Sequence, residues 1–495
     1  MTLRIGTRDD FARVREWLDR LDFSEESIVD LLRLPNMSRL PDANSSNITG
    51  GTPALRAAMA LFIDGSTVPT ALIESVCDAA TLASLRVLDL VRDSPEGGVT
   101  CPVWLYPTDG FCVASDRQLR PDAEGSGELV FPAHDSGTLH LLKLLPDARA
   151  GHALDLCAGT GIGALHLVRA GMSATSLDIT ARSAHFADFN AQLNGLRIES
   201  LRGDLFAPVE GRAFDLICAH PPWVPSLGDG AVFREGGNIG EELVARLVAD
   251  LPHHLQPGGT AILMCMGRDG RDASFEQRLR GWLGEAGATF DIMVGVMRTM
   301  SIDEFTGSLQ RLHFRGDGDK AERLAQRFRD LQTEKFIYGA TFIRRTGTPV
   351  REPPLRVRMT GAATNADFER ILAWRTFRRR PAFADWLLAT RPRLPSGLTM
   401  TMQHIVRDGR MVPDNARFVS SGALSTTIQL DVWTTQLLSQ FDGQLTSIDA
   451  FKAAERSGGL PAECTWPILA DLIGQMAERG IVVVDGPDGQ PNPGS

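Results

Sequence analysis

Apolar residues recur at helical spacing from about residue 8 to residue 95. Phe11, Val14 and Leu18 lie three or four positions apart, which places their side chains on one face of a helix. Between Gly97 and Asp116 the pattern changes to short apolar runs interrupted by prolines and a glycine, which indicates short strands. Helices followed by a small β-ribbon predict a winged-helix-like N-terminal domain over residues 1–130. The spacing places its further helices at residues 28–32, 54–62 and 72–91.

The middle of the chain, residues 131–347, alternates short apolar runs with helical patterns. The runs suit strands that are buried on both faces, and alternation of strands and helices predicts a Rossmann-like α/β fold with a mainly parallel sheet. A charged segment, Asp317 to Thr333, is expected to be a helix with a solvated face. The predicted strands lie at residues 153–156, 174–177, 214–219, 260–264, 290–296 and 336–344, with a further one before Gly203.

A glycine-rich turn follows the first of these strands. Asp155 lies at the end of the strand, and Gly159, Gly161 and Gly163 come shortly after it. Glycine lets the backbone turn sharply and approach a ligand without a Cβ between them. The turn therefore suits a nucleotide-binding βαβ unit. The same glycines also fit a looser dinucleotide fingerprint, or could serve only as a tight strand-to-helix turn.

Acidic residues and a double proline follow at the ends of later strands. Asp178 and Asp204 end the second and third strands, and the fourth runs into His220-Pro221-Pro222-Trp223. The prolines fix the loop and remove two N–H donors, which leaves its carbonyls as acceptors. This order resembles the class I S-adenosylmethionine-dependent methyltransferases. It is most similar to the branch with an (Asn/Asp/Ser)-Pro-Pro-(Tyr/Phe/Trp) motif, which includes the HemK-type protein-glutamine N5-methyltransferases.

The resemblance implies a cofactor, S-adenosyl-L-methionine, at the carboxyl edge of the sheet. In the family an acid at Asp178 accepts hydrogen bonds from the ribose hydroxyls, and an acid at Asp204 accepts from the adenine amino group. Asp204 could alternatively be a turn aspartate. The segment 131–136 either closes over the methionine end of the cofactor or caps a helix through Asp135 or Ser136, with His134 as a loop residue. The implied cofactor-binding residues are Asp155, Cys157, Gly159, Gly161, Asp178, Asp204 and Leu205.

The resemblance also implies an acceptor site at the double-proline loop. Its first residue and a proline carbonyl would hold the N–H groups of a planar acceptor, and Trp223 would lie against the acceptor's face. His220 departs from the usual Asn, Asp or Ser, which puts recognition of an amide in doubt and makes an amine, amino acid or hydroxyl acceptor plausible. A neutral imidazole can accept one hydrogen bond or act as a base. The catalytic candidates are His220, Pro221 and Trp223, and Arg234 could bind a substrate carboxylate. Alternatively, His220 and Trp223 could be packing residues, and Arg234 could be a solvated loop residue.

The C-terminal part, residues 348–495, predicts an α+β, winged-helix-like domain. A Pro- and Arg-rich linker over residues 345–354 precedes it, and strands near 398–406 and 480–485 enclose several helices. Arg375 and the run Arg378 to Arg380 form the densest basic cluster. We interpret this cluster as a solvated helix end, although it could meet an acidic partner or RNA. Residues 487–495 are expected to be disordered.

Composition narrows the remaining choices. The 495 residues carry a net charge of −10, which disfavours binding to the phosphate backbones of nucleic acids. The N-terminal domain lacks a basic recognition helix, so a packing or substrate-gating role is favoured for this domain. Seven cysteines without a CxxC pair predict a reduced, cytoplasmic protein without a thiolate metal site. No apolar run approaches the ~20 residues needed to cross a bilayer, and the N-terminus lacks a signal peptide's apolar segment.

The sequence thus predicts an S-adenosylmethionine-dependent methyltransferase. Its acceptor would be a nitrogen or other heteroatom of a small molecule, an amino acid, or a peptide or protein side chain. The alternatives are an RNA or DNA base N-methyltransferase, and a regulator that senses the cofactor without catalysis.

Overall fold

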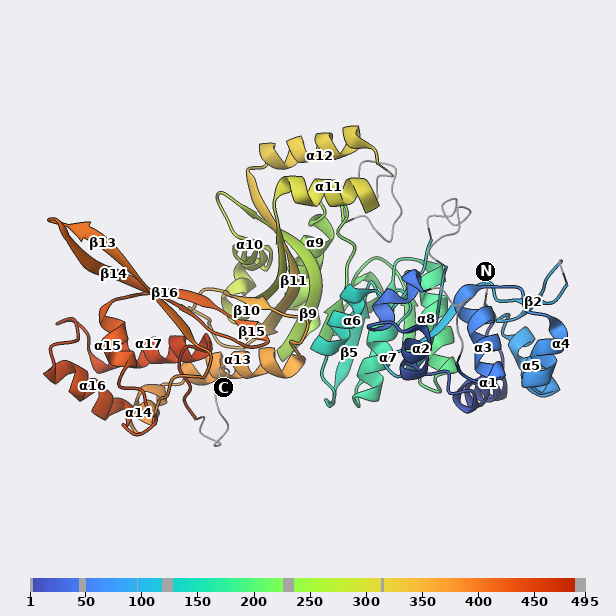
Figure 1. Ribbon diagram of the computed structural model, residues 1–495, viewed down its shortest axis with the longest axis horizontal. Helices are drawn as coiled ribbons and strands as arrows, with labels where there is room; N and C mark the ends of the chain where they lie inside the picture. The colour runs from blue at the N-terminus through green and yellow to red at the C-terminus, as the bar shows by residue number, and fades with distance from the viewer. Residues whose placement is uncertain are drawn as a thin grey trace. The chain divides into compact units, whose positions relative to one another are not determined.

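The computed structural model describes residues 3–43, 50–95, 97–117, 128–225, 236–312 and 316–485 (Figure 1). The chain forms two compact units. One unit comprises residues 1–290 and 299–349, and the other comprises residues 291–298 and 350–495. The division of the chain into domains 1–130, 131–347 and 348–495 stays a prediction. Among the described residues, no helix combines the length and the apolar composition that spanning a membrane requires.

Amphipathic helices form the N-terminal part of the first unit, as the apolar spacing predicts. The first buries Phe11, Val14, Trp17 and Leu18, and a capping box with Thr7 begins it. Two short antiparallel ribbons follow the helices. The winged-helix assignment stays a prediction. The elements are α1 (Arg8–Arg20), α2 (Glu25–Leu32), η1 (Met37–Asp42), α3 (Pro53–Met59), η3 (Ala60–Asp64), α4 (Thr70–Val76), α5 (Ala79–Val87), β1 (Arg92–Asp93), β2 (Val99–Thr100), β3 (Trp104–Thr108) and β4 (Phe111–Ser115).

A mixed sheet forms the core of the first unit and confirms the predicted α/β core. Five strands are parallel in the order β7-β6-β5-β8-β9, and β11 adds to β9 in the antiparallel direction. The strands are β5 (His152–Leu156), β6 (Ser173–Asp178), β7 (Glu199–Arg202), β8 (Phe214–Ala219), β9 (Leu255–Gly270) and β11 (Thr333–Arg345). The helices are α6 (Ser136–Leu144), α7 (Ile162–Arg169), α8 (Ala181–Leu193), η5 (Ala207–Val209), α9 (Glu242–His254), α10 (Phe275–Trp282) and η6 (Gly284–Thr289).

The strand order reverses beside β5, which lies between β6 and β8. In open α/β sheets, ligands bind outside the carboxyl ends of the strands at such a reversal. The glycine turn leaves β5 at this edge, Asp178 ends β6, and His220 follows β8. The fold therefore brings the predicted cofactor and acceptor segments to one edge of the sheet.

Two helices, α11 (Ile302–Leu312) and α12 (Gly318–Asp330), precede β11. The helix expected at residues 317–333, with a solvated charged face, is present; its buried face was not predicted. One face of α12 is buried, with Leu324 and Phe328 fully enclosed. These side chains join Phe305 of α11 and Phe336 of β11 in an apolar cluster that also contacts Trp223. The charged residues occupy only the opposite face, so the helix is amphipathic.

The second unit is an α+β assembly. Residues 293–296 of β10 (Phe290–Met300) pair in parallel with β12 (Leu355–Met359), which pairs antiparallel with β15 (Leu424–Ser425). A second, three-stranded sheet contains β13 (Thr399–Arg407), β14 (Arg410–Val419) and β16 (Thr427–Asp431). The strand expected at 480–485 is only an isolated bridge between Val483 and Arg393. The helices are α13 (Asn365–Arg378), α14 (Phe383–Leu388), α15 (Trp433–Leu438), α16 (Ser447–Arg456) and α17 (Trp466–Glu478).

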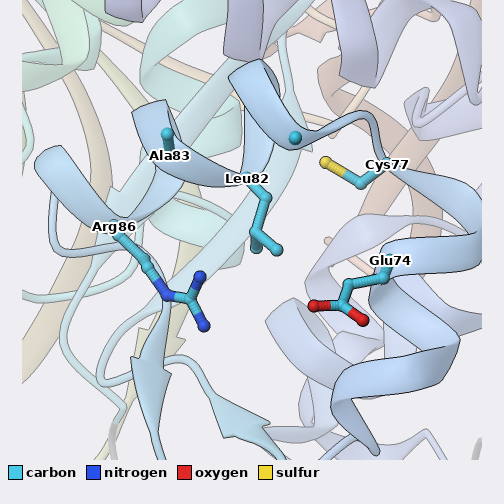
Figure 2. Close-up of a pocket in the computed structure, with 6 residues that line it drawn as sticks. Glu74, Cys77, Leu82, Ala83 and Arg86 are labelled. Atoms are coloured by element: carbon cyan, nitrogen blue, oxygen red, sulfur yellow. The ribbon is translucent and has the colours of Figure 1, made fainter.

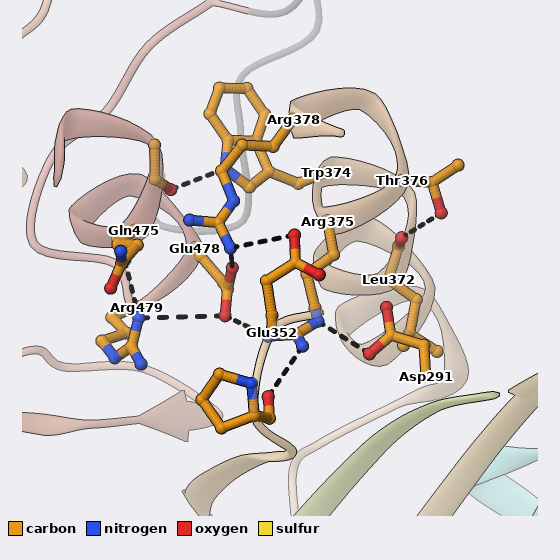
Figure 3. Close-up of polar contacts among 12 residues, drawn as sticks. Asp291, Glu352, Leu372, Trp374, Arg375, Thr376, Arg378, Gln475, Glu478 and Arg479 are labelled. Carbon is orange, nitrogen blue, oxygen red and sulfur yellow. Dashed lines mark hydrogen bonds and ion pairs between the residues drawn. The ribbon is translucent and has the colours of Figure 1, made fainter. Parts of the chain in front are cut away.

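Most of the basic cluster at the end of α13 is not solvated, contrary to the expectation from its charge pattern. Arg375 is buried, and its Nε lies 2.9 Å from Asp291 of β10, while other guanidinium nitrogens donate to Glu478 of α17 and to the Pro353 carbonyl (Figure 3). Arg378 lies 3.3 Å from the same Glu478. Carboxylates of the same unit thus pair with Arg375, Arg378 and Arg379, whereas Arg380 is exposed.

Candidate active site

The carboxyl group of Asp155 lies under the first turn of α7. One oxygen accepts the Ala164 N–H at 2.9 Å, and the other lies 3.4 Å from the Cys218 thiol of β8. Burial raises the pKa of Asp155 to about 7, although both hydrogen bonds oppose this shift. A Cβ on Gly163 would come within 2.8 Å of the carboxylate. Glycine at this position therefore lets the helix begin directly over Asp155.

The glycine turn itself is held by Asp178. One carboxylate oxygen accepts the N–H of Gly159 at 3.0 Å, and the other accepts the N–H of Thr180 at 3.0 Å. Gly159 and Gly161 both have positive φ angles, which glycine adopts without strain. A Cβ on Gly159 would meet no atom within 4 Å. The turn therefore has open space beside its backbone, as a bound ligand would require.

The other predicted cofactor residues surround the same turn. Cys157 has a φ of 55°, which is uncommon for a residue other than glycine. Burial raises the pKa of its thiol, and the negative charges of Asp178, Asp155 and Asp204 add to this effect. All three predicted carboxylates thus raise the pKa of the same thiol.

Asp204 and Leu205 follow β7 at the same edge of the sheet. Leu205 is buried and also has a positive φ, 46°. Asp204 remains exposed, and one of its oxygens accepts a hydrogen bond from Arg246 of α9 at 2.6 Å. The structure thus gives Asp204 an ion-pair partner that the sequence did not predict. Both interpretations of Asp204, an adenine contact and a turn aspartate, stay open.

The ring of His220 lies between two hydroxyl groups. Its Nδ1 is 3.3 Å from Thr138 Oγ1 of α6, and its Nε2 is 3.4 Å from the Tyr338 hydroxyl of β11. Burial lowers the pKa of His220, and the charge of Asp135 opposes this only in part. The imidazole is therefore neutral near pH 7, with one donor and one acceptor nitrogen. Burial also raises the pKa of Tyr338, which keeps its hydroxyl protonated.

Trp223 packs against the helices that precede β11. Its ring centroid lies 6.1 Å from Phe305 and 6.4 Å from Tyr338, and both pairs are tilted. A Cβ on Gly236 would lie 2.7 Å from the Pro222 carbonyl, and one on Gly240 would lie 2.3 Å from the Trp223 carbonyl. These glycines let the following segment lie directly against the double-proline loop. Arg234 lies outside the described residues.

The segment before α6 has a structural role at this site. Asp135 caps the helix by accepting the N–H of Gly137 at 2.8 Å, so the helix-cap interpretation is confirmed. His134 lies in the turn before α6, as predicted, and is buried against Trp104 and Tyr106. Burial lowers the pKa of His134 to about 4, so it stays neutral. Thr138 and Tyr338 were not predictable as site residues from the sequence, in which the one signal is that Tyr338 is one of two tyrosines in the chain.

A surface pocket of about 600 Å³ lies elsewhere in the first unit, at α4 and α5 (Figure 2). Cys77 lines it together with Glu74 and Arg86. Burial raises the pKa of Cys77 to about 11, so its thiol is protonated and is a poor nucleophile. None of the lining residues belongs to the predicted cofactor or acceptor site.

Comparisons with known proteins agree on the central part of the chain. The family model described as "Methyltransferase small domain" matches residues 130–281. The "Putative protein N5-glutamine methyltransferase" of Methanocaldococcus jannaschii is 31% identical over 144 residues, which cover 28% of this chain and 72% of that protein. The ribosomal protein uL3 glutamine methyltransferase of Bordetella pertussis is 27% identical over 291 residues, or 54% of this chain and 94% of that protein.

Other relatives are matched over a smaller part of their length. The chain spans about half the length of a second uL3 glutamine methyltransferase and of a release factor glutamine methyltransferase. A solved structure, the T. thermophilus 16S rRNA N2 G1207 methyltransferase with AdoMet and guanosine, is 20% identical with a TM-score of 0.27, over 49% of this chain and 66% of that one.

Proposed function

Because this chain belongs to the class I S-adenosyl-L-methionine-dependent methyltransferases of the HemK branch, we propose that it methylates a nitrogen atom of a protein side chain. The observation that carries the proposal is the meeting of the glycine turn and the double-proline loop at one edge of the sheet. The names of the relatives support a protein acceptor, since they specify glutamine of ribosomal protein uL3 or of a release factor.

The residues around the glycine turn fit the cofactor. S-adenosyl-L-methionine supplies an electrophilic methyl group on a sulfonium sulfur. The open space beside Gly159 would admit it against the backbone, and the carboxylate of Asp178 is available at the strand end for ribose hydroxyls. Asp155, Cys157, Gly161, Asp204 and Leu205 would complete the site.

We assign the acceptor site to His220, Pro221 and Trp223. The neutral imidazole has one nitrogen that can accept a hydrogen bond, and the Pro221 carbonyl can accept another. Together they would bind the N–H groups of the substrate nitrogen that receives the methyl group. A hydroxyl lies near each ring nitrogen, Thr138 at Nδ1 and Tyr338 at Nε2. The hydroxyl beside the ring N–H would accept from it and so fix the tautomer, and the other ring nitrogen would accept from the substrate in place of its neighbouring hydroxyl. Trp223 would lie against the planar group. Catalysis would then rest mainly on placing the nitrogen in line with the methyl group.

The electrostatics of the chain disfavour an RNA acceptor. Its net charge is −10, and most of the predicted basic cluster is paired within its own unit, as Arg375 is with Asp291 and Glu478. Proteins that bind nucleic acid depend strongly on cationic contacts with phosphates. A protein acceptor does not impose this requirement.

The acceptor class can be tested with labelled cofactor. The protein and S-adenosyl-L-methionine carrying a labelled methyl group are incubated with cell extract, and the product is treated with protease or with ribonuclease. We expect the label to be released by protease alone, and to be absent with the Asp178→Ala variant. Label that is released only by ribonuclease, or label found only in small metabolites, would overturn the proposal. Acid hydrolysis then separates amide from amine products, because N5-methylglutamine releases methylamine whereas methylated amines survive.

A further inference from the structure

Two asparagines of α8 and its C-cap bind the free edge of the β3–β4 hairpin. Asn190 accepts the N–H of Ala114 at 2.8 Å and donates to its carbonyl at 3.0 Å. Asn194 makes the same pair of bonds with Cys112, at 2.9 and 2.8 Å. Residues four apart on a helix rise by ~6 Å, and residues two apart on a strand are separated by ~6.6 Å. The two side-chain amides therefore bind the hairpin in the way a neighbouring strand would.

The second amide hydrogen distinguishes the two asparagines. A primary amide carries two N–H donors. Asn194 donates its second amide hydrogen to the carbonyl of Asn190 in its own helix, at 2.8 Å. Asn190 donates its second amide hydrogen to the carbonyl of Thr160, at 3.0 Å. Thr160 lies in the glycine turn between Gly159 and Gly161. Asn190 thus joins the hairpin to the turn, whereas Asn194 joins the hairpin only to α8.

A second contact from α8 holds the same turn. Ala187 lies one helical turn before Asn190, and a Cβ on Gly161 would lie only 2.7 Å from the Ala187 Cβ. The hairpin also contacts the segment before α6, because the Tyr106 hydroxyl of β3 accepts the N–H of Ala133 at 2.7 Å. A continuous set of contacts therefore runs from the hairpin to the glycine turn and to the segment before α6.

We propose that Asn190 is a positioning residue for the cofactor-binding turn. It fixes the Thr160 carbonyl to the hairpin, so the N-terminal part of the chain helps to shape the turn without touching the cofactor. The proposal rests on the proposed function, since it needs the turn to bind S-adenosyl-L-methionine. Loss of the bond would leave a buried carbonyl without its donor and free the turn to change conformation, which weakens cofactor binding.

Matched substitutions at the two asparagines test this role. Asn190→Leu and Asn194→Leu each remove the two bonds to the hairpin, but only Asn190→Leu also releases Thr160. We expect Asn190→Leu to weaken binding of S-adenosylhomocysteine, measured by calorimetry, by about tenfold. Asn194→Leu should change it less than about twofold. Thermal denaturation reports how far each variant destabilises the fold. Equal affinities for the two variants would overturn the proposal, as would losses of affinity that merely follow the two losses of stability.

Hydrogen exchange of the unaltered protein provides a second test if Asn190→Leu does not fold. S-adenosylhomocysteine should slow exchange in residues 157–164 and also in residues 111–115 of the hairpin, whose Ala114 N–H is bound to Asn190. Slower exchange at the turn alone would overturn the proposal. If the unaltered protein binds no S-adenosylhomocysteine at all, the proposed function fails instead, so the two failures are distinguishable.

Discussion

Substitution of Asp155 by Asn should change how the stability of the protein depends on pH. Burial raises the pKa of this carboxyl group from 3.8 to about 7 in the folded protein. In the unfolded chain the group ionises near its ordinary pKa, whereas in the folded protein it stays protonated until about pH 7. The unfolded state therefore loses its proton first as the pH rises. The contribution of Asp155 to the unfolding free energy is fully present below about pH 4 and is lost as the pH rises to about 7.

The size of the effect follows from the shift. A difference of one pKa unit corresponds to about 1.4 kcal/mol. The shift at Asp155 therefore lowers the unfolding free energy by up to about 4 kcal/mol at pH 8. Asn has nearly the same shape but does not ionise. We expect the unfolding free energy of Asp155→Asn, minus that of the unaltered protein, to rise by about 1.4 kcal/mol per pH unit from about pH 4 to 7 and then to level off. Other titrating groups contribute equally to both proteins and cancel in this difference.

Urea denaturation of both proteins at several pH values measures this difference. Cys218→Ala is the matched control, because it removes the thiol that donates to Asp155 but keeps the buried carboxyl group. It should therefore keep the pH dependence that Asp155→Asn abolishes. A difference between Asp155→Asn and the unaltered protein that is independent of pH would refute the reasoning. The carboxyl group would then ionise at the same pH in both states.

Three further substitutions have definite expected outcomes. Asp178→Ala should abolish S-adenosylhomocysteine binding in calorimetry, because it removes the proposed partner of the ribose hydroxyls and frees the N–H of Gly159 in the turn. Unchanged affinity would reject the assignment. His220→Ala should lower methyl-transfer turnover by about a hundredfold or more with less than about a twofold change in cofactor affinity, and equal losses in both would contradict its role. In the unaltered enzyme, burial lowers the pKa of His220, so a fall in turnover caused by its protonation should begin only below about pH 6.5. Glu478→Gln should lower the unfolding free energy of the second unit by about 3–5 kcal/mol in urea denaturation, since Arg375 loses a buried partner; a change below about 1 kcal/mol would show that the other carboxylates suffice.

The core was predictable because its signals are local. A strand buried on both faces reads as an apolar run, and the glycine turn, the acids at strand ends and the double proline follow one another in a fixed order along the chain. The sequence therefore placed β5, β6, β8 and their following residues at one edge. It could not place Tyr338 beside His220, because the two residues are 118 positions apart and the contact depends on the pairing of β11 with β9.

The features that the sequence did not predict share the same physical cause. The charged pattern of residues 317–333 concealed an apolar face whose partners, such as Phe305 and Phe336, lie on other elements. The sequence indicated that Arg375 belongs to a solvated cluster, because its carboxylate partners Asp291 and Glu478 are 84 and 103 positions away. Local periodicity predicts an element and its apolar face, but the partner of a charged side chain is set by the tertiary fold.

A crystal structure of the protein with S-adenosylhomocysteine would test the central claim most directly. We expect the nucleoside at the carboxyl ends of β5 and β6, with its ribose hydroxyls on Asp178 and its sulfur facing the loop of His220 and Trp223. Ligand bound away from this edge, or a sulfur directed away from that loop, would contradict the account.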